Sequence, residues 1–221
     1  MKYTSLIISF LLLCIVSPSY IYGQDICTGN VGDNIFLRGD FGSGVAPVLA
    51  IDPMIAPGYT YVREVPIDGE YVVCSRSSAL AGLYGSWLNI TDNSTDPNGY
   101  MMIVNADFTP GIFYEETVEN LCENTLYEFS ADVINMIRIG INDHSDPNVT
   151  FLIDDVEYYS TGDIPKIQEW IKYGFSFTTD ASQSSVTLTL INNAPGGIGN
   201  DLGIDNISFR PCGLGSLVGF E

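Results

Sequence analysis

Hydrophobic and polar residues alternate along much of the chain with a period of two, which is the spacing of a β-strand buried on one face. Between Tyr127 and Val133 every second residue is apolar, and the residues between them are polar. The segments 149–153, 171–178 and 186–190 alternate in the same way, and further candidate strands cover 34–37, 71–75, 87–90, 100–105 and 113–118. Only 77–83 is compatible with a short helix.

Residues that favour turns separate these segments. Asp68-Gly69, Asp96-Pro97-Asn98-Gly99 and Thr109-Pro110-Gly111 combine glycine or proline with a small polar side chain, which is typical of tight turns. Many short strands at such spacing predict an all-β protein, a jelly-roll β-sandwich of two antiparallel sheets.

The last predicted strand begins with a carboxylate. Asp205 shares an alternating face with Ile207 and Phe209, while Asn206 and Ser208 fall on the other face. A carboxylate that faces a core is costly unless a cation or hydrogen-bond donors stabilise it. We therefore expect Asp205 to have a specific partner.

The first residues are typical of a secretory signal peptide. Lys2 gives a positive start, an apolar run extends over 6–16, and Ser17-Pro18-Ser19 interrupts it. The run is too short to span a bilayer, and we expect cleavage after about Gly23. The predicted organisation is a signal peptide over 1–23, one β-sandwich domain over 24–213, and a tail or truncated linker over 214–221.

The charge of the chain excludes two classes of partner. The sequence holds 27 acidic and 8 basic residues, and only one basic residue lies within 1–23, so the mature net charge is about −20. Such a surface repels nucleic acids and anionic membranes, and we expect neither nucleic-acid binding nor membrane insertion. Outside the cell, where calcium is plentiful, carboxylates can also serve as calcium ligands.

Four cysteines remain after cleavage: Cys27, Cys74, Cys122 and Cys212. An even number in a secreted chain predicts two disulfides, and three pairings are possible. A bond from Cys212 to either Cys27 or Cys122 is preferred; closing a loop of that length removes on the order of 4 kcal/mol of freedom from the unfolded chain. A zinc site is the alternative, but the chain has a single histidine, His144, and no C-x-x-C pair.

Several motifs resemble known modules. Gly39-Asp40-Phe41-Gly42-Ser43-Gly44, the segment 99–106, Trp170 and Asp205-Asn206-Ile207-Ser208-Phe209 occur in the order found in galactose-binding-type jelly rolls, which include many carbohydrate-binding modules. The segments 121–131 and 192–202 more closely resemble the N-terminal module of surface proteins that gliding bacteria secrete by the type IX system. The resemblance covers nearly the whole mature chain and implies display at the cell surface.

The resemblance also implies a structural calcium ion between the first and last strands. Asp40 and Asp205 match the ligand positions. Related modules often have glutamate where this chain has Gly42, so backbone carbonyls would complete the six to eight oxygens that calcium accepts. The alternative is that Asp205 accepts hydrogen bonds from nearby amides and that Asp40 sits in a turn.

Four aromatic residues are candidates for a sugar-binding face: Trp87, Tyr100, Tyr114 and Trp170. Sugar rings stack on flat aromatic surfaces while fixed polar groups recognise their hydroxyls, and Asn105, Glu116 and Asn135 are candidates for that second role. The alternative is that these aromatic side chains belong to the core, as aromatic residues at strand spacing usually do.

Catalysis is not predicted. His144 has no serine or cysteine partner in a convincing context, and no Gly-x-Ser-x-Gly motif is present. The pairs Glu115-Glu116 and Asp154-Asp155 are adjacent in predicted strands, so their side chains point to opposite faces and cannot converge on one glycosidic bond.

The leading hypothesis is a non-catalytic extracellular binding or adhesion module that recognises polysaccharide and holds a structural calcium ion. A purely structural spacer domain of a larger surface protein is the alternative, and a glycoside hydrolase domain is the third. The sequence does not indicate the oligomeric state.

Overall fold

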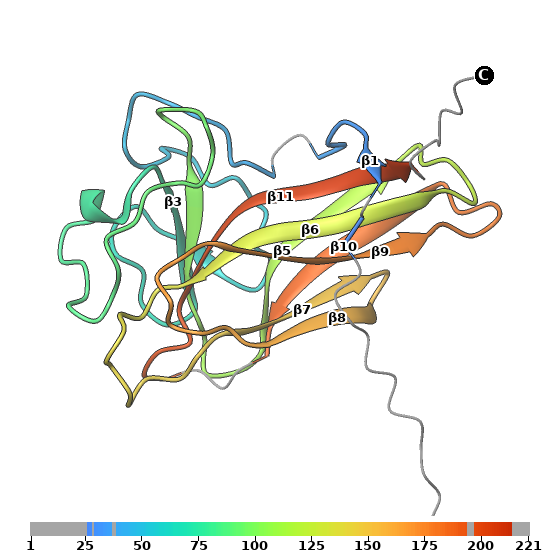
Figure 1. Cartoon of the computed structure of the whole chain (residues 1–221). Coiled ribbons are helices and arrows are strands. Elements are labelled where there is room, and N and C mark those ends of the chain that lie inside the picture. Colours follow the sequence, from blue (N-terminus) through green and yellow to red (C-terminus); the bar gives the residue numbers. More distant parts are fainter. Residues whose placement is uncertain (1–25, 28, 37–38, 194–196, 214–221) are drawn as a thin grey trace, which may run out of the picture.

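The alternating segments form the strands of two facing sheets in the computed structural model, which describes residues 26–27, 29–36, 39–193 and 197–213 (Figure 1). The strands are β1 (Asn30–Val31), β2 (Thr60–Tyr61), β3 (Glu70–Cys74), β4 (Met101–Asn105), β5 (Gly111–Glu119), β6 (Leu126–Asn135), β7 (Asn148–Ile153), β8 (Val156–Asp163), β9 (Ile171–Thr178), β10 (Ser185–Asn192) and β11 (Leu202–Gly213). The larger sheet has seven strands, in the order β2-β3-β4-β11-β6-β9 with β1 also paired to β11, and the smaller sheet has the order β5-β10-β7-β8. The predicted all-β jelly roll is confirmed.

Aromatic side chains from both sheets fill the space between them. Phe129 of β6 meets Phe151 of β7 edge to face, with ring centroids 5.1 Å apart, so that residues of different sheets interlock. Tyr127 stacks on Phe209 of β11 at 4.9 Å. The period-two alternation of β6, β7, β9 and β10 places these apolar residues inward, as the sequence predicts.

A second apolar layer covers the outer face of the larger sheet. Val72 and Cys74 of β3 and Met101 and Ile103 of β4 point away from the sandwich interior, and the segment 76–92 packs over them with Leu80 and Trp87. Because β3 and β4 are buried on both faces, they are continuously apolar rather than alternating. This segment differs from two expectations. The expected strand at 87–90 is a covering loop whose one β-bridge, between Trp87 and Ile137, lies outside the named strands, and the possible short helix at 77–83 is one 3-10 turn over Ser77–Ala79.

A β-bulge in β11 changes the predicted direction of Asp205. Asp205 pairs with Asp132 and Ser208 pairs with Ser130, so β11 has one more residue than β6 over this interval. Asn206 adopts a φ of 49°, and the extra residue reverses the alternation. Asp205 therefore lies on the outer face of the sheet, and the prediction that it shares a face with Ile207 and Phe209 is wrong. The prediction that it is buried is confirmed.

One disulfide, between Cys27 and Cys212, joins the two ends of the described domain. It is one of the two bonds that the sequence favours. The predicted second disulfide is wrong, because Cys74 is a buried free thiol in the second apolar layer and Cys122 is an exposed free thiol. Burial raises the pKa of Cys74 to about 12, so this side chain acts as a small apolar core residue.

The structure differs from the prediction at both edges of the sandwich. Strand β8, which the sequence did not predict, is an edge strand in which Tyr159 is the one buried residue, so its pattern is too weak to detect. No strand forms among the described residues of 34–37. The predicted signal peptide at 1–23 and the predicted tail at 214–221 lie outside the described residues.

Candidate binding pocket and candidate cation site

A pocket of about 270 Å³ opens where β4 ends and β11 begins. We call it the Asp201 pocket, after the residue that immediately precedes β11. Its wall combines the end of β4 with four loops, because the strand ends of the larger sheet meet here. The lining residues are Asp68, Tyr84, Ser86, Trp87, Asn105, His144, Gly197, Ile198, Gly199 and Asp201.

Asp201 is a buried acid with one unmet acceptor. The residue is 5% exposed, and its Oδ2 accepts a hydrogen bond from the indole Nε1 of Trp87 at 2.8 Å. Oδ1 is buried and has no hydrogen-bond partner among the described residues. Leaving a buried acceptor unpaired costs roughly 1–3 kcal/mol. A ligand donor that reaches the floor of the pocket would supply the missing bond.

Burial raises the pKa of Asp201 to about 7. The Trp87 indole opposes this rise, and the neighbouring carboxylate of Asp68 adds to it by repulsion. The Ala106 backbone amide also lowers the pKa, although its placement falls short of a hydrogen bond. A carboxyl group that changes charge near neutral pH in a cleft is a marker of a functional site.

The rim of the pocket is apolar, in contrast to its floor. Tyr84 and Ile198 line the mouth, and Ile198 is 66% exposed. Phe108 is 65% exposed and lies beside Gly197, 3.8 Å from the position that a Cβ would take there. Gly199 holds this loop close to the neighbouring loop, since its φ is 90° and a Cβ would lie 2.6 Å from the carbonyl oxygen of Ser145.

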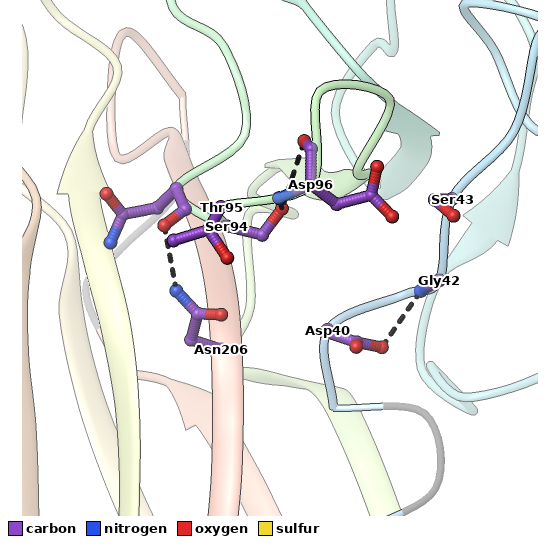
Figure 2. Close-up of a pocket in the computed structure, with 8 residues that line it drawn as sticks. Asp40, Gly42, Ser43, Ser94, Thr95, Asp96 and Asn206 are labelled. Atoms are coloured by element: carbon purple, nitrogen blue, oxygen red, sulfur yellow. Dashed lines mark hydrogen bonds between the residues drawn. The ribbon is translucent and has the colours of Figure 1, made fainter.

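A second hollow, of about 370 Å³, lies farther along β11. We call it the Asp40 hollow. Figure 2 shows Asp40 on one side and the loop that carries Ser94, Thr95 and Asp96 above it, with Asn206 of the β11 bulge alongside. The remaining lining residues are Gly42, Ser43 and Asn93.

The acids of the Asp40 hollow are held in place by local hydrogen bonds. Asp40 Oδ1 accepts from the Gly42 amide at 3.0 Å, and Asp96 Oδ1 accepts from the Asn98 amide at 3.0 Å. The amide of Asn98 and the hydroxyl of Ser43 lower the pKa of Asp96, so this side chain is ionised at neutral pH.

Asp205 does not line the Asp40 hollow, although its neighbour in sequence, Asn206, does. It is fully buried, and its oxygens accept from the backbone amides of Asn93 at 2.6 Å and Asn206 at 2.7 Å. Burial raises its pKa to about 7; the two amides oppose the rise, and Asp92 and Asp132 add to it. The structure thus places Asp205 in the amide-accepting role that the sequence analysis gave as the alternative to a metal ligand.

The residues around the Asp40 hollow are chemically compatible with calcium. Asp40 and Asp96 supply carboxylate oxygens, Asn93 and Asn206 supply amide groups, and Ser43 supplies a hydroxyl group. Among the described residues, no group of three or more histidine, cysteine, aspartate or glutamate side chains is arranged to hold a metal ion. Any calcium site here would therefore depend on two carboxylates and on neutral oxygens.

The four aromatic residues predicted for sugar binding are not brought together on one face. Tyr100 and Tyr114 are buried in the main core, where their hydroxyl groups donate to Ala46 O and Glu116 Oε2. Trp170 is half-buried against the second apolar layer. Trp87 is buried too, but it lines the Asp201 pocket and is fixed there by its bond to Asp201.

The predicted polar partners separate in the same way. Asn105 lines the Asp201 pocket and donates to Pro66 O at 2.9 Å. Glu116 accepts from Tyr114, and Asn135 is fully engaged with Asp146, Ile164 and Ile137.

Sequence reasoning missed Asp201 itself. The signal was present, since Asp201, Gly203 and Asp205 alternate with Leu202 and Ile204. The sequence does not reveal that the loop 84–92 covers this face of the sheet and buries the acid.

No family model matches this sequence, and no curated protein sequence is significantly similar to it. Among solved structures, the chain is similar to the Stig cyclase FisC from Fischerella sp. TAU in complex with (3Z)-3-(1-methyl-2-pyrrolidinylidene)-3H-indole, with 15% identity, a TM-score of 0.57, and coverage of 82% of this chain and 98% of the cyclase. It is also similar to a cyclase from Fischerella sp. TAU in complex with 4-(1H-indol-3-yl)butan-2-one, with 13% identity, a TM-score of 0.54, and coverage of 84% and 100%.

Weaker likenesses include a CBM4 structure, at 14% identity and a TM-score of 0.39, with coverage of 79% of this chain and 97% of that one. A TM-score at this level carries no weight for function. Within the described residues, no helix has the length and apolar character needed to cross a bilayer. What the chain shares with these structures is the all-β jelly-roll fold.

Proposed function

We propose that this chain is a non-catalytic binding module that works outside the cell and takes a saccharide in the Asp201 pocket. The observation that carries the proposal is the pairing of a buried, half-satisfied carboxylate on the floor with an exposed apolar rim. Small-molecule sites typically combine a few convergent polar groups with apolar walls. A sugar ring has the matching character, since its hydroxyl groups donate hydrogen bonds and its C–H faces pack on apolar surfaces.

The test is a glycan array probed with the wild-type protein and with Phe108→Ala. Loss of one stacking ring should weaken binding by roughly 1–3 kcal/mol, by analogy with base stacking. Val156→Ala is the matched control, because Val156 is 58% exposed at the β7–β8 turn and does not line the pocket. Absence of binding to every glycan by a folded protein would favour the alternative, a structural spacer in a larger surface protein.

A second candidate function is acid catalysis on a glycoside. It is favoured by one observation, namely that Asp68 and Asp201 line the same pocket and that Asp201 changes charge near neutral pH. Turnover of chromogenic glycosides that is lost in Asp201→Asn would support this candidate and overturn the non-catalytic assignment.

Secretion and surface display are part of the proposal. The apolar N-terminal segment of the sequence and the disulfide between Cys27 and Cys212 support it, since disulfides persist in oxidising compartments. The resemblance of 121–131 and 192–202 to modules of gliding bacteria favours a surface protein of that class. Detection of the protein only inside intact cells would contradict this part of the proposal.

Calcium is proposed to bind in the Asp40 hollow through Asp40 and Asp96, where it would neutralise two carboxylates and tie the loop at 93–96 to the turn at 40–43. Thermal unfolding with calcium and with a chelator tests this. At a calcium concentration one hundred times the dissociation constant, the folded state gains about 2.7 kcal/mol. Asp96→Asn should remove that gain, and a melting midpoint that a chelator leaves unchanged would exclude a tight site.

A further inference from the structure

The Asp201 pocket holds two carboxyl groups and, within the described part of its lining, no lysine or arginine that would balance their charge. Asp201 and Asp68 both line it, and Asp107 raises the pKa of Asp68 by repulsion after burial, the larger cause. Among the described lining residues there is no lysine or arginine. Arg138, on the loop after β6, donates from Nε to the Trp87 carbonyl oxygen at 2.7 Å and does not line the pocket.

The other titratable groups around the carboxylates are tyrosines that stay neutral or a histidine that already has an acidic partner. The charge on Asp201 raises the pKa of Tyr84 and Tyr59, which adds to the larger effect of their burial and keeps both hydroxyl groups neutral. His144 lines the pocket, and its Nδ1 is paired with Asp143 Oδ1 at 2.8 Å, so this ring already has a carboxylate partner outside the pocket lining. A cation is therefore the component that this pocket lacks.

The floor of the pocket selects among ligand donors. A sugar hydroxyl would pair with the unmet Oδ1 of Asp201 but would leave the carboxylate charge without a counter-ion. An ammonium group offers three donors together with a positive charge. Charge-assisted hydrogen bonds of this kind are roughly twice as strong as neutral ones, and the low dielectric of a buried site strengthens them further.

The aromatic wall is consistent with a cationic ligand. Tyr84 packs edge to face on Trp87, with centroids 5.0 Å apart, and Tyr84 is 36% exposed at the mouth of the pocket. A cation placed over an aromatic face is attracted by the negative π-surface of the ring. Ile198 of the pocket lining and Phe108 beside Gly197 are both exposed, so they remain available to pack against the C–H face of a ring.

We propose that the ligand of the Asp201 pocket is an amino sugar with a protonated amine, whose ammonium group binds between Asp201 and Asp68 while its ring packs against the apolar rim. This inference rests on the proposed saccharide-binding function and specifies its ligand class. It follows from the unmatched carboxylates of the pocket, not from the net charge of the chain.

The experiment uses three β-1,4-linked disaccharides that differ only at C2: that of glucosamine with a free amine, that of N-acetylglucosamine, and that of glucose. Binding is followed at pH 7 by NMR through the indole N–H of Trp87, which donates to Asp201, while the second tryptophan, Trp170, gives the reference signal. We expect the amine to bind at least tenfold more tightly than the other two, and Asp201→Asn to abolish that preference.

Asp155→Asn is the matched control. It removes the same charge from an exposed position in the β7–β8 turn, where Asp155 has a φ of 64° that asparagine also adopts readily. If both variants weaken amine binding equally, general attraction to an acidic protein explains the result and the inference is overturned. Should Asp201→Asn fail to fold, Asp68→Asn replaces it, with an expected loss of about threefold; no loss there also overturns the inference.

Two further outcomes separate this inference from the function on which it rests. If all three disaccharides shift the Trp87 signal with equal affinity, saccharide binding stands and the preference for an amine is wrong. If none of them shifts it in a folded protein, and the glycan array is also negative, the proposed function fails and the inference fails with it.

Discussion

Asp201 and Asp205 are four residues apart at the start of β11, both are buried on the same side of the sheet, and burial raises the pKa of both to about 7. Their partners differ. Asp205 accepts two backbone amides at 2.6 and 2.7 Å, whereas Asp201 accepts one indole N–H and keeps a second oxygen unpaired beside a pocket. A perturbed pKa alone therefore does not separate these two acids, and what distinguishes Asp201 is its unmet acceptor beside a cavity.

The largest difference between the two acids is expected in the free energy of unfolding when each is replaced by alanine. Asp205→Ala leaves two buried backbone amides without an acceptor and should lower the free energy of unfolding by roughly 2–5 kcal/mol. Asp201→Ala leaves one indole N–H beside a pocket that water can enter, and should cost about 1 kcal/mol. Urea unfolding at pH 5, where both carboxyl groups are protonated in the folded state, measures the two costs. Equal costs would remove the distinction between the two sites.

The effect of Asp201→Asn on stability should depend on pH. The pKa of Asp201 is near 4 in the unfolded chain and about 7 in the folded one, so between these values only the folded state keeps the proton. Its contribution to stability therefore falls as pH rises from 4 to 7 and is constant above. We expect the asparagine variant to match the wild type at pH 4 and to be more stable by about 1–3 kcal/mol at pH 8.5. A variant that is less stable at pH 8.5 would contradict the raised pKa.

Trp87→Phe should have a smaller effect that is specific to the charged form of Asp201. The change removes the indole donor, so the pKa of Asp201 rises further and the variant should lose about 1–2 kcal/mol more at pH 8.5 than at pH 5. Titration of the aspartate carboxyl carbons by NMR measures the pKa directly. The signal of Asp205 serves as the control, because it makes no bond to Trp87 and should not move.

Calcium should produce the smallest change. It should affect the pKa of Asp205 and leave that of Asp201 unaffected, whereas Trp87→Phe should affect only Asp201. A cation in the Asp40 hollow lies next to Asn93 and Asn206, which carry the amides bound to Asp205, and should lower the pKa of Asp205 by about one unit or less. The pKa of Asp201 should stay constant. The same carboxyl titration with and without calcium tests this, and Asp40→Asn should cancel the shift at Asp205.

The interior of the sandwich was predictable from the sequence because one physical rule dominates it. The alternation in β6, β7, β9 and β10 gives the inward faces directly. The bulge at Asn206 was not predictable, since a single residue with φ of 49° reverses every face that follows it. The sequence narrowed the disulfide partner of Cys212 to two cysteines but did not choose between them. Cys74 and Cys122 are free thiols because folding places them in different parts of the structure.

The candidate site was much less predictable than the fold. Tyr100 and Tyr114 are aromatic, as a sugar-stacking surface requires, but both are buried in the core. The sequence could not show this, because their spacing is the same for a surface role and for a buried one. Trp87 and Asn105 were named as candidates for sugar contact, and the structure places both in the lining of the Asp201 pocket. Asp201, Tyr84 and Ile198 come from segments up to 117 residues apart in the sequence, and only tertiary contacts bring such positions together.

The bond between Cys27 and Cys212 has a mechanical consequence. It closes a loop of 185 residues that contains almost the whole described domain, and β1 and β11 lie side by side at the same place. A force that pulls the two ends of the domain apart would pass through the disulfide and bypass the sheets. Under such a force the pocket would keep its shape until the disulfide is reduced.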